Sequence, residues 1–356
     1  MDRTTVNLSA LSANLAPSLD LFADVVRNPA FAPPEVERVR AQRLAGIAAE
    51  LTQPSAIALR TLPPLLYGTG HPYGIPFTGT GDPAVVAKVG RDDMVAFQRA
   101  WLRPDNLQMF VVSDLPAAQV REQLEAKLGS WRASGAKGTK NLDALIPPAR
   151  SRIVLIDRPG SPQSVILAGQ VLPVTGDEEL IALVSANDVL GGNFLSRLNT
   201  DLREKKGWSY GVGAQVNRVL GKVPYIVSAP VQADSTGPAI DALRGDMREF
   251  LGQRGVTPTE LELTINGSVR ELPGSFETGS QVLSGMQRNA LFGRPDDYYD
   301  TLADRYRALT APQLDAAARA VIDPDKLLWV VVGDAAKVRP QLDALKLPVE
   351  TVAATK

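Results

Sequence analysis

The sequence predicts an α+β protein built from two homologous domains, each a mostly antiparallel sheet with helices packed on one face. Two observations lead to this prediction. One is a long internal repeat, and the other is the alternation of apolar stripes at helical spacing with short apolar runs bounded by Pro and Gly. The length of 356 residues also favours two domains, since a domain typically takes roughly 100–200 residues.

The repeat is clearest where a helical stretch is followed by a Pro turn and an apolar strand. Residues 102–114 and 322–334 match at one constant offset, with Pro, Asp, Leu, two Val and a final Asp in the same places. Similar segments precede both copies in the same order, with the small changes in spacing that loop insertions cause. A period this long indicates a duplicated domain and not a solenoid. A chance resemblance between two strand ends is the alternative.

The two copies differ in what they contain. Residues 151–222 have no counterpart in the first copy, so we expect the first domain to be incomplete, its missing part preceding Met1. We therefore predict that residues 1–131 are the C-terminal part of the first domain. Residues 132–150, rich in Gly, Lys, Pro and Ala, are predicted to be a linker. The complete second domain is then 151–356.

Each domain has its expected elements. The first has helices over 15–27 and 34–51 and a last strand over 107–112. In the second, the pair Thr175 and Glu178 predicts a capping box at the start of a helix, and Thr257 begins another helix. The remaining elements expected there are strands over 153–157 and 164–169, a hairpin of 208–217 with 223–231, a helix along 240–251, helices from about 281 and 312, and a last strand over 327–332.

Composition excludes several classes of function. The 38 basic and 39 acidic side chains nearly cancel, which argues against a nucleic-acid partner. There is no cysteine, so disulfides, thiolate nucleophiles and cysteine metal ligands are excluded. No apolar run approaches the ~18–20 residues of a membrane span, and Met1 is not followed by a signal-peptide pattern. Because the only histidine is His71, no two-histidine zinc motif exists, and we interpret His71 as a residue that anchors a turn.

The segment 190–214 carries the strongest motif. It contains Gly-Gly-Asn-Phe-Leu-Ser-Arg-Leu, then Leu-Arg-Glu-Lys-Lys-Gly-Trp-Ser-Tyr and an apolar strand. This resembles the signature of the insulinase/pitrilysin/mitochondrial-processing-peptidase family of zinc peptidases. Residues 70–74 (Gly-His-Pro-Tyr-Gly) and the helix-to-strand stretches of both copies also resemble the family, so that the resemblance covers essentially the whole chain in order.

The resemblance implies that zinc is not bound by this chain. Active members carry an inverted H-x-x-E-H motif and a third acidic ligand on a later helix, which here corresponds to residues 35–46. The two acids of that helix fall on Ala45 and Gly46, which cannot coordinate a metal. Glu50, one turn later, is the only nearby substitute, and we do not expect it to serve. The chain alone is therefore predicted to be inactive, and zinc is expected in a partner half.

The resemblance also implies which residues act. The family's Arg and Tyr, which reach the zinc site from the partner half, carry over to Arg203 and Tyr210. Arg can donate to substrate carbonyls, and the Tyr hydroxyl can donate to a developing oxyanion. Asn193 and Phe194 are expected to line the same substrate-binding cavity, and the hairpin after Tyr210 to pair with an extended peptide.

The sequence thus predicts a non-catalytic subunit or half of a zinc metallopeptidase. Its expected partners are a zinc-bearing half of the same family, in a heterodimer, and a peptide or unfolded polypeptide substrate. Family resemblance suggests a periplasmic location. Two alternatives stay open: a purely structural or interaction protein of this fold, and the C-terminal part of an active zinc endopeptidase whose ligands lie upstream.

Overall fold

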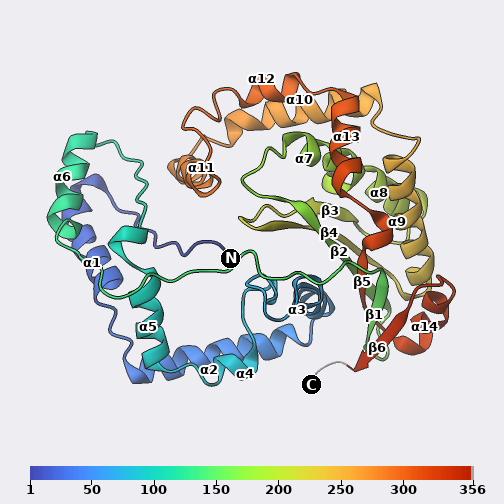
Figure 1. Cartoon of the computed structure of the whole chain (residues 1–356), viewed down its shortest axis with the longest axis horizontal. Coiled ribbons are helices and arrows are strands. Elements are labelled where there is room, and N and C mark those ends of the chain that lie inside the picture. The colour runs from blue at the N-terminus through green and yellow to red at the C-terminus, as the bar shows by residue number, and fades with distance from the viewer. Residues whose placement is uncertain (354–356) are drawn as a thin grey trace.

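Six strands form one mixed sheet in the computed structural model, which describes residues 1–353 (Figure 1). Their order is β3-β4-β2-β5-β1-β6. The three pairs from β3 to β5 are antiparallel, and β1 is parallel to both β5 and β6. The strands are β1 (Arg152–Asp157), β2 (Gln163–Thr175), β3 (Gly213–Val216), β4 (Lys222–Gln232), β5 (Leu328–Gly333) and β6 (Val349–Ala353). The predicted α+β class is confirmed.

The centre of this sheet is buried on both faces. Successive side chains of a strand point to opposite faces, and both sets along β1 and β5 are apolar. Ile153, Leu155, Trp329 and Val331 join one core cluster, whereas the alternate residues of the same strands join another. A run such as Leu-Trp-Val-Val-Val, apolar at every position, is typical of a strand covered on both sides.

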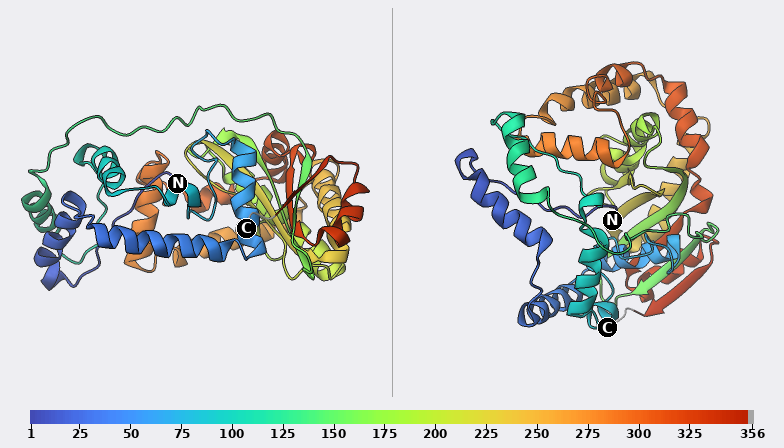
Figure 2. Two further views of the ribbon diagram at one scale, coloured as in Figure 1. Left: turned by 90° about the horizontal axis from the view of Figure 1, so that it is seen from below. Right: turned by 60° about the vertical axis from the view of Figure 1, so that its left-hand side comes forward.

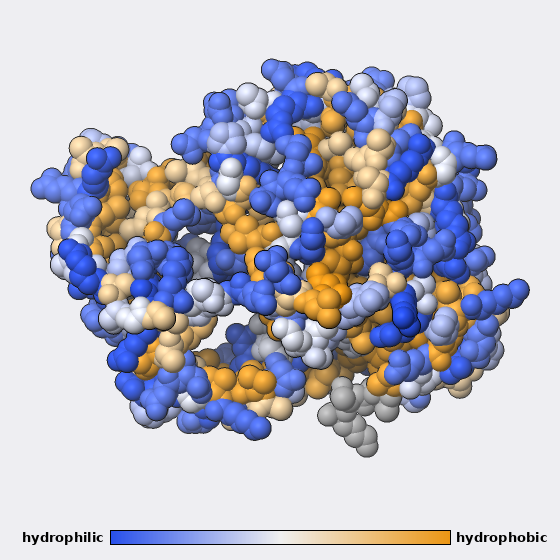
Figure 3. Space-filling view, viewed as in Figure 1, coloured by the Kyte–Doolittle hydropathy of each residue, from blue (hydrophilic) through white to orange (hydrophobic). Residues whose placement is uncertain are grey.

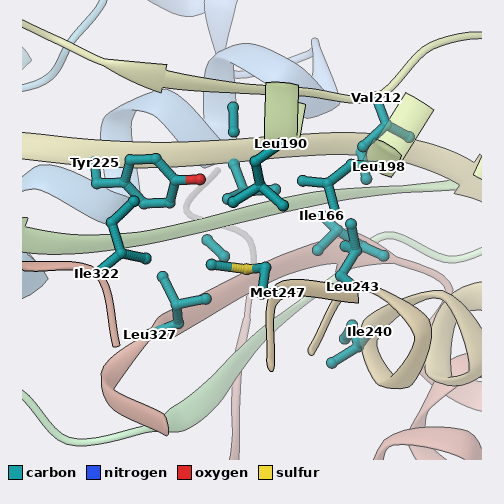
Figure 4. Packing of buried hydrophobic residues seen from close by; sticks show 14 of the residues in the cluster. Ile166, Leu190, Leu198, Val212, Tyr225, Ile240, Leu243, Met247, Ile322 and Leu327 are labelled. Atoms are coloured by element: carbon teal, nitrogen blue, oxygen red, sulfur yellow. The ribbon is translucent and has the colours of Figure 1, made fainter. Parts of the chain in front are cut away.

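The helices of the second half cover the first of these faces. In Figure 4, Leu243 and Met247 of α9 lie against Ile166 of β2, with Leu190 and Leu198 beside them. The helices of this half are α7 (Ile181–Asn187), α8 (Arg197–Asn199), α9 (Thr236–Leu251), α10 (Pro258–Gly274), α11 (Gly279–Leu291), α12 (Leu302–Arg307), α13 (Ala311–Val321) and α14 (Ala335–Asp343), with 3-10 turns Ala233–Ser235 and Pro324–Lys326.

The opposite face is covered by a helix from the first half of the chain. Ile57, Leu62 and Leu66 of α3 pack on β2 and β5. The expectation of helices on one face therefore holds within the second half, but the folded chain has three layers. The first half contains α1 (Leu15–Arg27), α2 (Pro33–Glu50), α3 (Pro54–Tyr67), α4 (Pro83–Val86), α5 (Arg91–Trp101) and α6 (Ala117–Leu128), with 3-10 turns Ser12–Asn14 and Pro104–Asn106.

The remaining helices of the first half stand apart from the sheet. Figure 1 shows α1, α5 and α6 on the far side of an open space, opposite the arm of α10, α11 and α12. Residues 129–151, which contain no helix or strand, return from α6 to the sheet as one extended segment (Figure 2). The space-filling view in Figure 3 shows a hollow between the outlying helices of the first half and the rest of the molecule. It also shows hydrophobic patches on these outlying helices.

The internal repeat is visible in the structure, except at one strand. Helix α5 and the 3-10 turn Pro104–Asn106 correspond to α13 and the turn Pro324–Lys326 at the same offset as the sequence match. The second copy continues into β5, but the predicted strand 107–112 is not a regular strand. A strand needs neighbours for its N–H and C=O groups, and no strand of the described chain pairs with 107–112. Its apolar side chains, such as Met109 and Val111, are consequently exposed.

Three other predicted elements differ from the structure. Glu178 does accept the Thr175 N–H at 2.8 Å, but Thr175 ends β2 and the helix begins only at Ile181. The strand over 327–332 is not the last, since β6 follows it and occupies the sheet edge. The predicted hairpin is present, with β3 shorter than expected and joined to β4 in register Gly213↔Ser228. Among residues 1–353, no helix combines the length and the apolar character required to cross a membrane.

An aromatic cluster joins the first half to the β3–β4 turn. The hydroxyl of Tyr73 accepts from the Gly221 N–H at 3.0 Å and donates to Asp2 at 2.7 Å. The hydroxyl of Tyr67 donates to the Lys222 carbonyl at 2.7 Å. These buried bonds fix the turn that supports one end of the hairpin.

Candidate functional site

The predicted site residues lie on the segment that joins α7 to β3. This segment passes through two π-helical turns, Asp188–Gly192 and Thr200–Lys205, which flank an exposed loop and the short helix α8. Such widened turns are rare and occur frequently at functional sites. Leu198 and Leu202, four residues apart and therefore on one helical face, are fully buried and anchor the segment to the core.

Arg203 lies between two aromatic rings. Its Cζ is 4.5 Å from the ring centroid of Phe194 and 5.1 Å from that of Tyr210, which are cation–π distances. Glu204 also contacts the guanidinium, with its Oε1 at 3.1 Å from Nε. The two rings are mostly exposed, Phe194 by 59% and Tyr210 by 88%. The structure thus brings together three of the four predicted residues and presents them to solvent.

Tyr210 is exposed on a loop whose backbone is fixed. The hydroxyl of Ser209 donates to the Pro230 carbonyl at 2.6 Å and accepts the Gly211 N–H at 3.1 Å. Ser209 also forms an isolated bridge to Val231 of β4. The residues on both sides of Tyr210 are therefore tied to the sheet while its side chain projects outward.

Asn193 shapes the exposed loop. Its Oδ1 accepts the N–H of Leu195 at 2.9 Å, a local turn that shapes the exposed loop. No hydrogen bond joins the Asn193 side chain to Arg203 or Tyr210 within the described residues 1–353. The prediction that Asn193 lines the cavity stays a prediction.

Asn199, which sequence reasoning missed, connects the two parts of the site. Its buried amide donates to the Phe194 carbonyl at 2.7 Å and accepts the Val212 N–H at 2.9 Å. It therefore holds the Phe194 loop next to the strand that follows Tyr210. The signal in the sequence is weak: a polar residue placed between Leu198 and Leu202.

The two glycines of the motif serve close packing. A Cβ on Gly191 would lie 2.7 Å from Cβ of Ala214 in β3, and one on Gly192 would lie 2.4 Å from Oδ1 of Asp188. Neither glycine has a positive φ. Gly191 is thus needed to let the π-helical turn approach the sheet, and Gly192 leaves room for the Asp188 side chain within the turn.

Arg197 secures the segment to α10. It forms two hydrogen bonds to the carboxylate of Glu260, both 2.7 Å, and a third to the Gly255 carbonyl at 2.7 Å. Burial acts to raise the pKa of Glu260, but the bonds from Arg197 and from the Thr257 cap outweigh it and hold the pKa below its usual value. Thr257 and Glu260 form a capping box, and the helix predicted to begin at Thr257 is present.

Asp188, at the start of the segment, lies in an environment that disfavours its ionised form. Burial, together with the negative charge of Glu271, raises the pKa of Asp188 to about 6. Its neighbour Asn187 donates to the Ala214 carbonyl at 2.8 Å, which again joins this turn to β3.

The positions that correspond to the family's third zinc ligand, and the nearby Glu50, do not fit a zinc site. Ala45 and Gly46 are exposed on α2 and supply no donor atoms. There is space for a side chain at Gly46, where an added Cβ would meet nothing within 4 Å, but glycine has none. Glu50 accepts bonds from Arg60 at 2.9 Å and Thr80 at 2.7 Å, so it holds a loop. Within residues 1–353, no three acidic or histidine side chains are grouped where they could hold a metal ion.

His71 anchors a turn, as predicted. Its Nδ1 accepts the N–H of Tyr73 at 3.0 Å, and its carbonyl accepts the N–H of Gly74 at 2.8 Å. The buried ring stacks on Tyr67 with the centroids 4.9 Å apart.

The fold and the site together define an insulinase-type α+β protein that has the Arg/Tyr loop and, among its described residues, no metal ligand set. Residues 88–268 match the family model described as the peptidase M16 inactive domain. The chain belongs to this family, which confirms the resemblance seen in the sequence.

Individual relatives agree with this assignment. The chain is 23% identical over 314 residues to an uncharacterized zinc protease of Bacillus subtilis, covering 88% of this chain and 74% of that protein. A crystal structure of a peptidase M16 inactive domain from Pseudomonas fluorescens matches with a TM-score of 0.80 and 24% identity, covering 91% and 76% of the two chains. The first half of the periplasmic protease PqqL from Escherichia coli matches with a TM-score of 0.67 and 16% identity, covering 95% and 75%.

Proposed function

We propose that this chain is the non-catalytic half of a zinc metallopeptidase and presents Arg203 and Tyr210 to the active site of a zinc-bearing half of the same family. The main support is the geometry of the pair: a guanidinium held between two aromatic rings and a phenol that is 88% exposed on an anchored loop. The pair is held in place by its own chain but remains open to solvent. This arrangement is expected of a site that a second protein surface completes.

The chemical roles follow from the two side chains. The guanidinium of Arg203 has five N–H donors for the carbonyl groups of a bound peptide. The hydroxyl of Tyr210 donates a hydrogen bond to the oxyanion that forms when a peptide carbonyl is attacked. Phe194 and Leu195, 59% and 74% exposed, provide apolar surface beside the pair.

An extended peptide has a suitable place to bind next to this pair. Among the described residues 1–353, strand β3 is at the edge of the sheet and pairs with β4 alone, so its outer side offers N–H and C=O groups to an added strand. In this proposal residues 1–131 are the C-terminal part of one domain, 132–150 the linker and 151–356 the second domain. The similarity to a periplasmic protease supports a periplasmic location.

The test is to purify the chain with its bound partner and to measure peptide cleavage with and without a chelator. Tyr210→Phe should lower kcat by about 100-fold, the usual cost of one oxyanion donor, and Arg203→Ala should also lower it, while the partner stays bound. Tyr299→Phe and Arg38→Ala serve as matched controls outside the site and should retain the parent rate.

Two other outcomes would support the alternative functions. Full activity in both site variants with assembly intact would mean that the chain is a structural or interaction protein. Chelator-sensitive cleavage by the chain without any partner would mean that it is itself an active zinc endopeptidase.

A further inference from the structure

A cavity of about 1110 Å³ lies between the two halves of the chain and is lined by neither Arg203 nor Tyr210. Its walls are the C-terminal part of α3, linker residues 146–150, the end of β2 and the C-terminal ends of α9 and α13. Its volume is slightly above the roughly 300–1,000 Å³ of typical ligand pockets.

The lining is strongly basic. One acid, Asp323, lines the cavity together with six cations, so the formal charge of the lining is 6 − 1 = +5. The cations are Arg150, Arg152, Lys222, Arg248, Arg319 and Lys326. The whole chain has a net charge of −1, so this excess is local and not a result of composition. A concave surface lined by one sign of charge concentrates ligands of the opposite sign.

Two of the cations are available for a ligand. Arg248, Arg319 and Lys326 are engaged by acids or carbonyls of their own chain. Lys222 donates to the Pro173 carbonyl at 2.8 Å. In contrast, Arg150 and Arg152 form no ion pair with any residue of the described range 1–353, and the Nε of Arg152 is buried without a hydrogen-bond partner. Both guanidinium groups therefore keep N–H donors for an anionic ligand.

The floor of the cavity favours a peptide over a small ion. Apolar side chains line it, including Leu66, Leu172 and Leu328. Strand β2 also continues beyond its last pair with β5, Gly169↔Leu328, as far as Thr175, and residues 170–173 of this extension line the cavity. On the side where β5 has ended, β2 presents a strand edge, and such edges pair with extended chains.

We propose that this cavity binds an extended acidic peptide segment. The carboxylates of the segment bind Arg150 and Arg152, its apolar side chains lie on the leucine floor, and its backbone follows the open edge of β2. This site is separate from the Arg203 and Tyr210 pair, and its occupation does not depend on the function proposed for that pair.

The test uses the full chain and a fluorescent peptide that alternates Glu and Val, followed by fluorescence anisotropy. The Glu peptide should bind about tenfold or more tightly than the same peptide with Gln in place of Glu, and its binding should weaken as salt is raised. Arg150→Gln should weaken binding about tenfold, the loss expected for one charge-assisted hydrogen bond. Because Arg150 is exposed, this variant keeps the fold, and Arg152→Gln should have the same effect.

A control locates the binding. Arg288→Gln removes an exposed arginine of α11 outside the cavity and should leave the affinity unchanged. Equal affinity for the Glu and Gln peptides, or undiminished binding by Arg150→Gln, would overturn the proposal. So would displacement of the peptide by dodecanoate at lower concentration, because the cavity would then be an acyl-anion site.

Discussion

Replacing Asp188 with Asn should stabilise the protein at neutral pH and leave it unchanged in acid. The folded state raises the pKa of Asp188 from 3.8 to about 6, through burial and through the like charge of Glu271. Below about pH 4 the carboxyl is protonated in both the folded and the unfolded chain, so it has no effect on the difference between them.

The destabilisation caused by Asp188 increases as the pH rises. Between about pH 4 and 6 the unfolded chain releases a proton that the folded chain retains, so the free energy of unfolding falls across this window. Above pH 6 the full cost applies, and a shift of about two pKa units corresponds to about 3 kcal/mol. Asn cannot ionise, so Asp188→Asn should gain up to about this amount at pH 7.

The assay is urea unfolding of parent and variant at several pH values between 4 and 7, followed by tryptophan fluorescence. Asp246, whose pKa burial and nearby Asp201 also raise to about 6, affects both proteins equally. The difference between them therefore isolates Asp188. Asp300→Asn, at an exposed position, is the control. A stability difference that is the same at pH 4 and pH 7 would refute the reasoning.

Two further substitutions test how the site is held. Arg197→Ala should lower the free energy of unfolding by about 2 kcal/mol, because the half-buried carboxylate of Glu260 loses both of its bonds to Arg197 and keeps only those from Thr257. Thermal unfolding measures this, and a loss below a few tenths of a kcal/mol would contradict it. Asn199→Ala should cost about 2–3 kcal/mol, since two backbone groups lose their buried partner. It should also speed amide hydrogen exchange in the loop around Tyr210, and an unchanged exchange rate there would argue against the bridging role.

Much of the fold could be predicted because its periodicities are strong. Helix α1 was predicted over the residues it occupies, and α2 differs by a residue at each end. The apolar runs of β1, β2 and β5 indicated buried strands. Strand β6 was missed because it is a short edge strand. The segment 107–112 has the same apolar pattern as β5 but lacks neighbours, and pattern alone does not report whether a partner strand is present.

The sequence predicted most residues of the site but not the contacts between them. Family resemblance identified Arg203, Tyr210 and Phe194, which lie together in the structure. No spacing rule indicates that Arg203 stacks between two rings, because the contact depends on how the π-helical turn and the β3 loop converge. For the same reason Asn199 was not predicted: its two partners are 5 and 13 residues away and meet only in the folded chain.

Helix α3 belongs to the first half of the chain but packs on the sheet of the second half, so the second half is not a complete folding unit by itself. A fragment that starts at residue 151 would contain all six strands, yet it would expose to water the side of the sheet formed by Val154, Ile156, Leu167 and Val330. A contiguous apolar surface of this kind causes self-association. Any attempt to express or crystallise the C-terminal half should therefore retain residues 54–67, and a protease cut in the linker should leave two pieces that remain associated.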